Sequence, residues 1–120
     1  PFFRYGNQFI SPRQAYIMHS EGYIKPLHGK SYYGTQLANY QRLGINNLVV
    51  TDGGFQEEAL EIAKVFDQVT LVRLSRPEKT FERDSRSYWK NSLDFYEYKI
   101  YNDSTLENLE TQVEQLLQVL

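Results

Sequence analysis

Two short apolar runs constrain the fold of this 120-residue chain more than any other feature. Residues 48–51 (LVVT) and 69–74 (VTLVRL) show almost no polar alternation, which is typical of strands covered on both faces. Between them, residues 55–66 place apolar side chains at helical spacing. A strand, a helix and a strand in this order predict parallel strands joined by a right-handed crossover.

The N-terminal part of the chain contains a clear helix start. Ser11 is a favourable N-cap and Pro12 suits the first helical position. We therefore predict a helix over residues 11–21, which Gly22 and Pro26 then break.

Two more helices and a third strand follow from the rest of the sequence. Residues 31–43 predict a helix that ends at Gly44. Residues 97–101 alternate polar and apolar side chains and predict a strand. A Ser104 N-cap with Glu107 three residues later predicts a capping box at the start of the last helix.

Together these elements predict one α/β domain over residues 1–120, with three layers (α/β/α) and a mostly parallel sheet. Hydrophobic residues make up 41% and charged residues 23%, which excludes disordered and low-complexity classes. The absence of cysteine excludes disulfides and thiolate metal sites. Because no signal peptide and no apolar stretch of about 18 residues is present, we expect a soluble, cytoplasmic protein with no membrane partner.

Charge is unevenly distributed along the chain, although the net charge is only −2. Residues 73–90 carry six basic and three acidic groups, whereas residues 91–120 carry six acidic groups and one lysine. An arginine-rich irregular stretch suits an anion, because guanidinium groups form bidentate bonds with phosphate. The alternative is a solvated loop with incidental salt bridges. The acidic remainder argues against DNA as a partner.

A carboxylate and two glycines follow the first apolar run. Asp52 would stand at the carboxyl end of a parallel strand, where α/β proteins bind ligands. Gly53 and Gly54 would let backbone amides approach an anion or a metal-bound phosphate. The alternative is an Asp that only caps the next helix. Arg13, at the predicted helix start, is a further cation beside amides that suit a phosphate.

Two other patterns predict no site. Residues 29–31 (Gly-Lys-Ser) look like the tail of a P-loop, but Ile24 stands where the loop needs its first glycine. His19 and His28 are nine residues apart with no acidic partner at ligand spacing, which argues against a zinc site and a Ser-His-Asp triad.

Five segments, in this order, carry a resemblance to a known family: residues 11–15 (SPRQA), 49–59 (VVTDGGFQEEA), 73–76 (RLSR), 84–88 (DSRSY) and 100–109 (IYNDSTLENL). They resemble the second half of phage-type deoxynucleoside monophosphate kinases. These are P-loop enzymes that transfer the terminal phosphate of ATP to a nucleoside monophosphate with Mg²⁺. The resemblance covers nearly the whole chain, and its last segment is the most specific.

The resemblance implies a nucleotide partner, ATP with Mg²⁺ as cofactors, and a role for each matching residue. Asp52 would be the catalytic carboxylate near Mg²⁺ and the attacking phosphate, and Arg83 and Arg86 would belong to the lid. The substrate-binding residues would be Ser11, Arg13, Gly53, Gly54 and Arg76, and the turn nearest the adenine would contain Asn102 and Asp103. Many relatives have Arg at Gly54 and Gly at Ser104.

The family's Walker A loop is the largest departure, because nothing before Ser11 can supply the first strand, the loop and the following helix. Either these residues are the C-terminal part of a longer chain, or this is a shortened relative. The missing strand would lie between the strands predicted at 48–51 and 69–74. Those strands must then close up, or a protein partner or dimer mate must fill the gap. The alternative function is a small, non-catalytic binding or inhibitory protein that recognises a protein or a nucleotide.

Overall fold

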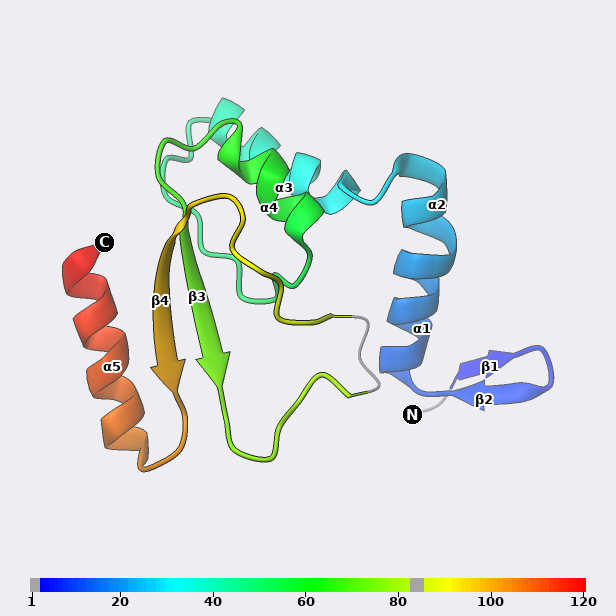
Figure 1. Ribbon diagram of the computed structural model, residues 1–120. Helices are drawn as coiled ribbons and strands as arrows, with labels where there is room; N and C mark the ends of the chain where they lie inside the picture. The colour runs from blue at the N-terminus through cyan, green and yellow to red at the C-terminus, as the bar shows by residue number, and fades with distance from the viewer. Residues whose placement is uncertain (1–2, 83–85) are drawn as a thin grey trace. The chain divides into compact units, whose positions relative to one another are not determined.

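The computed structural model describes residues 3–82 and 86–120. The chain divides into two compact units, which meet in sequence at Phe66 and Asp67 (Figure 1). Helices, one antiparallel hairpin and one parallel strand pair confirm a mixed α/β protein. The finer prediction, a three-layer α/β/α fold with a mostly parallel sheet, is not confirmed, because each sheet of the described residues has only two strands. Among the described residues, no helix combines the length and the hydrophobicity that a membrane span requires.

The first unit begins with a β-hairpin that the sequence patterns did not indicate. β1 (Phe3–Tyr5) pairs antiparallel with β2 (Gln8–Ile10) across a two-residue turn. Gly6 begins this turn with φ of +59°, a conformation that glycine adopts without steric cost.

A continuous helical segment follows the hairpin: α1 (Pro12–His19), η1 (Ser20–Ile24) and α2 (Lys25–His28). The predicted cap at Ser11 is confirmed, because its Oγ accepts a hydrogen bond from the Gln14 backbone N–H at 3.2 Å. The Gln14 side chain in turn accepts from the Ser11 N–H at 2.7 Å. This reciprocal pair satisfies two backbone donors that a helix start leaves open.

The predicted break at Gly22 and Pro26 is wrong. The chain forms a π-helical turn there, and the Lys25 N–H donates to the carbonyl oxygen of Ser20, five residues back. Pro26 follows this turn and lies in the first turn of α2, where a proline is tolerated because the N–H that it lacks is one that a helix start leaves unsatisfied. The helical segment ends instead at Gly29, which has φ of +99°.

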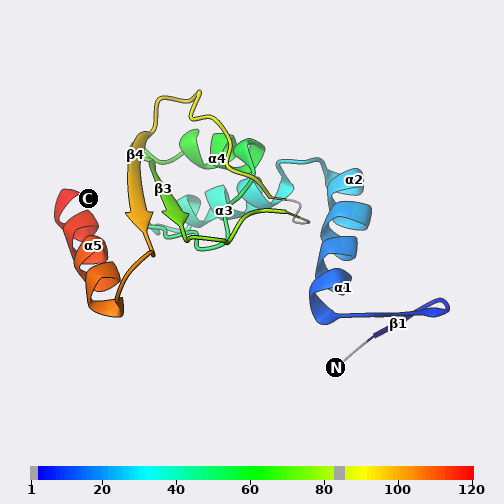
Figure 2. The same cartoon turned by 60° about the horizontal axis from the view of Figure 1, so that its bottom comes forward.

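Two further helices, α3 (Tyr32–Arg42) and α4 (Gln56–Ala63), pack side by side in this unit (Figure 2). α3 confirms the predicted helix, which ends before Gly44 at φ of +84°. The two helices approach most closely at Gly34, where an added Cβ atom would lie 2.4 Å from the carbonyl oxygen of Glu58. A glycine is therefore required at this contact.

The strand predicted at residues 48–51 is wrong. Residues 45–50 have no regular structure, and the Val49 side chain is 86% exposed. Within the described residues no strand lies alongside this run, so its backbone has no ladder to join. An apolar run becomes a buried strand only when a neighbour pairs with it.

The second unit is built on a parallel pair, β3 (Thr70–Ser75) and β4 (Tyr96–Tyr101), aligned from the first residue of each strand to the last. Both strands were expected, but β3 pairs with β4 and not with residues 48–51. Helix α5 (Leu106–Val119) packs against β4 (Figure 1). Ile100 of β4 and Leu116 of α5 are the buried apolar side chains of this unit among the described residues.

The start of α5 differs by one residue from the prediction. Thr105, and not Ser104, is the N-cap, and its side chain accepts from the Asn108 N–H at 3.2 Å. The third helical position is consequently Asn108, so the capping box predicted with Glu107 does not form.

A glutamine of α5 closes the outer edge of β4. The side-chain Nε2 of Gln112 donates to the Tyr101 carbonyl oxygen at 2.9 Å, and its Oε1 accepts from the Tyr101 N–H, also at 2.9 Å. The amide thus replaces the peptide group of a neighbouring strand, which protects a backbone site that would otherwise be open.

The contact between α3 and α4 yields a matched pair of substitutions. Gly34→Ala should lower the free energy of unfolding by about 1–3 kcal/mol, because its Cβ would clash with the Glu58 backbone at 2.4–2.5 Å. Gly22→Ala, where a Cβ meets nothing within 4 Å, should instead stabilise the helical segment by up to about 1 kcal/mol. Urea denaturation of both variants measures the difference. Equal losses in the two variants would contradict the close approach.

Candidate functional site

The carboxyl ends of β3 and β4 bring three predicted site residues together. Arg76 directly follows β3, and Asn102 and Asp103 directly follow β4. The Asn102 N–H donates to the Ser75 carbonyl oxygen at 2.8 Å, which ties the two strand ends to each other. We call Arg76, Asn102 and Asp103 the carboxyl edge. This edge of a parallel pair is where α/β proteins bind ligands.

The carboxyl edge offers a cation, a carboxylate and an amide. Arg76 and Asp103 are exposed and Asn102 is half-buried. Among the residues that the structure describes, none forms an ion pair with Arg76. An unpaired guanidinium suits phosphate oxygens, whereas a carboxylate and an amide suit hydrogen-bond donors and acceptors of an organic group. The combination fits a ligand that carries an anionic group together with hydrogen-bonding groups.

Arg73, also in the arginine-rich stretch, is held by its own surroundings. Its Nε donates to the Glu97 carboxylate at 2.8 Å, and its Nη2 donates to the carbonyl oxygen of Trp89. Its guanidinium carbon lies 5.9 Å from the ring centroid of Tyr88 and 6.0 Å from that of Trp89. These contacts tie the long connection between β3 and β4 to the sheet.

The connection itself contains the predicted lid. In its described part it forms no helix. The Tyr88 hydroxyl donates to the Leu74 carbonyl oxygen, and the Tyr88 ring meets Phe81 edge-on at 4.8 Å. Arg86 is half-buried, with its guanidinium carbon 5.9 Å from the Phe81 centroid. Arg83 lies outside the described residues.

In the first unit, residues 52–54 lie in the loop before α4. Asp52 and Gly53 are exposed and Gly54 is half-buried. Because residues 48–51 form no strand, the prediction that Asp52 ends a strand is wrong. Asp52 caps no helix either, since Phe55 is the N-cap of α4 and makes no side-chain cap hydrogen bond.

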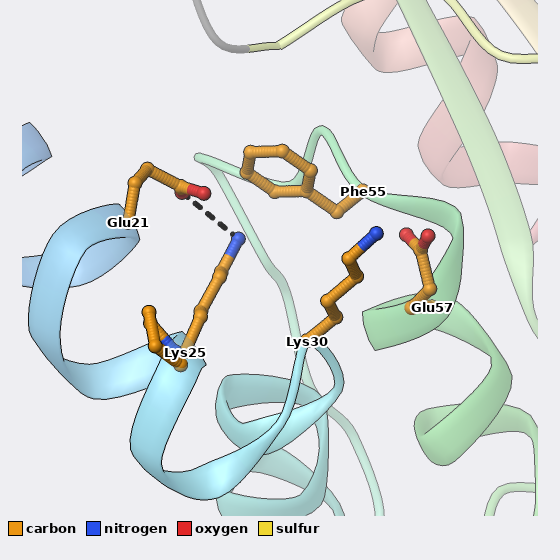
Figure 3. Close-up of a pocket in the computed structure, with 6 residues that line it drawn as sticks. Glu21, Lys25, Lys30, Phe55 and Glu57 are labelled. Atoms are coloured by element: carbon orange, nitrogen blue, oxygen red, sulfur yellow. Dashed lines mark ion pairs between the residues drawn. The ribbon is translucent and has the colours of Figure 1, made fainter.

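Next to this loop lies a buried cation. Lys25 is only 7% exposed, and its Nζ lies 3.0 Å from a Glu21 carboxylate oxygen and 3.4 Å from one of Glu58. The same Nζ stands 3.4 Å from the centroid of the Phe55 ring (Figure 3). We call Glu21, Lys25, Phe55 and Glu58 the Lys25 cluster. The i,i+4 spacing of Glu21 and Lys25 in the sequence indicates their ion pair. No sequence pattern indicates the contacts of Lys25 with Phe55 and Glu58.

An open depression of about 320 Å³ adjoins the Lys25 cluster, and its lining residues are Glu21, Lys25, Pro26, Lys30, Phe55 and Glu57. Lys30 and Glu57 point toward each other across it (Figure 3). The lining is therefore of mixed charge and is not a purely anionic or cationic site.

Ser11 and Arg13 stand apart from this depression. Both lie at the start of α1, and Lys25 follows about 20 Å further along the same helical segment. The Ser11 hydroxyl is occupied by its cap hydrogen bond with Gln14. The structure therefore does not bring Ser11 and Arg13 to the Lys25 cluster.

Within the described ranges there is no group of three or more His, Cys, Asp or Glu side chains that could hold a metal ion. Asp52 alone fits Mg²⁺ only in the manner usual for this ion, with one or two protein carboxylates and the remaining ligands from substrate phosphates and water.

Burial raises the pKa of Glu58 above its ordinary value. The nearby Lys25 ammonium and its hydrogen bond oppose this rise, whereas the carboxylates of Glu21 and Asp52 add to it. Asp52 is thus close enough to influence the electrostatics of the Lys25 cluster.

Comparison with protein-family models found no match. Comparisons with curated proteins and with solved structures found none either.

Glu58→Gln should change how stability depends on pH. Because the folded-state pKa of Glu58 is raised, its protonation contributes stability that is fully present below the ordinary pKa of 4.5 and is lost as the pH rises through the folded-state pKa. Glutamine does not titrate, so the wild type should lose stability relative to the variant as the pH rises above 4.5. Urea denaturation at a series of pH values measures this shift. A constant difference across the range would contradict the raised pKa.

Proposed function

We propose that the chain forms part of a deoxynucleoside monophosphate kinase of three-layer P-loop architecture, which transfers a phosphoryl group from ATP to a nucleoside monophosphate. The carboxyl edge carries this proposal. Arg76 and Asn102 belong to two separate segments of the family resemblance, and the parallel pairing of β3 with β4 brings them to the same edge. There the Asn102 N–H donates to the carbonyl oxygen of Ser75, the residue before Arg76, at 2.8 Å. That convergence is what a nucleotide site needs.

Each residue then has a physical role in the proposed kinase. Arg76 binds phosphate oxygens with its fork of donors, and Asn102 and Asp103 form hydrogen bonds with the nucleoside. Asp52 holds Mg²⁺, which neutralises charge on the transferring phosphate. Arg86, with Arg83, covers the phosphates and excludes water.

The proposed kinase also requires a segment with a Walker A loop. We place its strand beside β3, supplied by a longer chain, a protein partner or a dimer mate. Support comes from the sheet of the second unit, which has only two strands among the described residues. Parallel sheets are normally larger and covered on both faces.

A non-catalytic binding protein is the second candidate. One face of α5 favours it, because four apolar side chains at helical spacing are exposed there: Leu106 at 78%, Val113 at 40%, Leu117 at 66% and Leu120 at 66%. An apolar stripe of this kind suits a protein partner.

The first test concerns Arg76. Arg76→Gln should weaken binding of dTMP or dGMP by about 1.5–3 kcal/mol, because a neutral amide cannot replace charge-assisted bonds with phosphate. Isothermal titration calorimetry at low and moderate salt measures the affinities, and wild-type affinity should fall with salt. Lys79→Gln removes a neighbouring exposed charge and should cost less than about 0.5 kcal/mol. Equal affinities in all three proteins would favour the binding-protein candidate.

The second test concerns turnover. The isolated 120-residue chain should show no measurable phosphoryl transfer, because the Walker lysine and loop amides supply much of the positioning. Joined to a Walker A segment, it should turn over at roughly 1–100 per second, and Asp52→Asn should abolish most of this rate with little effect on folding. A coupled ADP-release assay measures both. Ordinary kinase turnover by the isolated chain would refute the proposal.

A further inference from the structure

Lys25 is the only charged side chain that is buried among the described residues, yet none of the proposed roles uses it. It lies on the helical segment of α1, η1 and α2, and its Nζ contacts the carboxylate of Glu58 and the ring of Phe55, both from the α4 region. Lys25 therefore joins two elements that are about 30 residues apart in sequence.

The surroundings of Lys25 leave it no capacity for a ligand. Its ammonium faces two carboxylates, Glu21 at 3.0 Å and Glu58 at 3.4 Å, and the face of the Phe55 ring at 3.4 Å. A buried ammonium must have such partners, since desolvation alone costs several kcal/mol. The two carboxylates would also repel a phosphate. Lys25 is thus suited to hold protein groups in place.

Through Phe55, Lys25 contacts the end of the loop that precedes α4. Phe55 follows Gly54, and Asp52 lies only three residues before Phe55. In the part of the chain that the structure describes, no hydrogen bond involves residues 52–54. Two adjacent glycines would leave this loop with wide backbone freedom. Its nearest fixed point is accordingly the Phe55 ring against Lys25.

We propose that Lys25 is a positioning residue that fixes the place of Asp52 by holding the Phe55 ring and the Glu58 carboxylate. Its importance for catalysis rests on the proposed function, in which Asp52 acts on the phosphate. Displacement of a catalytic group by about 1 Å can lower the rate by about 10²-fold. Loss of an anchor three residues from Asp52 is therefore expected to lower the rate. Lys30 lines the same depression but is exposed, and it provides the matched comparison.

Nuclear magnetic resonance of the 120-residue chain tests this role in three variants. Lys25→Met keeps most of the side-chain length without the charge, Lys25→Arg keeps the charge, and Lys30→Met removes a charge from the same depression. Backbone order parameters of residues 52–55 should fall from about 0.85 to below about 0.6 in Lys25→Met. They should stay near the wild-type value in Lys25→Arg and Lys30→Met.

The Lys25 εCH₂ protons give a second, independent readout. In the wild type they should be shifted upfield by the ring current of Phe55, and Phe55→Leu should abolish that shift. Phe55→Leu should also loosen Gly53 and Gly54 while it retains the Lys25–Glu58 pair, so it tests the anchor if Lys25→Met does not fold. Unchanged order parameters in a folded Lys25→Met or Phe55→Leu protein would overturn the proposal.

Nucleotide is absent from this experiment, so its outcome separates from that of the proposed function. If the Arg76 titration fails but Lys25→Met loosens the loop, the positioning role stands and the kinase proposal falls. If the loop stays rigid in Lys25→Met and the Arg76 titration gives the expected result, the positioning role falls and the kinase proposal stands.

Discussion

The second unit depends on the parallel pairing of β3 and β4. Parallel strands cannot be joined by a tight turn, so the chain needs a long connection that returns to the start of the sheet. That connection has no helix in its described part, and Arg73 holds it through Glu97, the Trp89 carbonyl and two aromatic rings. The same pairing places both carboxyl ends at one edge. Architecture and candidate site therefore share one cause.

The cations of this chain fall into two groups by their surroundings. Lys25 and Arg73 each form an ion pair with a carboxylate and lie near the faces of aromatic rings, so these contacts hold chain segments together. Arg76 and Lys30 are exposed and have no ion pair within the described residues, so their charge is available to a ligand. The amino-acid composition does not distinguish these four cations. Only burial and contacts separate an anchor from a binding group.

Local signals in the sequence predicted the helix start at Ser11 and both parallel strands, because caps and patterning act over a few residues. The failures arise where distant or neighbouring structure decides. The run at 48–51 has the composition of a buried strand but no partner strand among the described residues. A π-helical turn, which no sequence pattern predicts, carries the first helical segment past Gly22 and into α2, where Pro26 lies in the first turn. The contact between Lys25 and Phe55 spans 30 residues, and nothing in either local segment predicts it.

The described residues bury few apolar side chains, namely Ala38, Ile100 and Leu116. A domain of this size normally buries more than 60% of the surface that its unfolded chain exposes. β3 shows the deficit most directly, because Val72 and Leu74 are 41% and 56% exposed on one face of a two-stranded sheet. In the proposed kinase, the strand that introduces the Walker A loop would also pair with the edge of β3 opposite β4, where no strand of the described residues pairs. Completion of the sheet and completion of the phosphate site would then be one event.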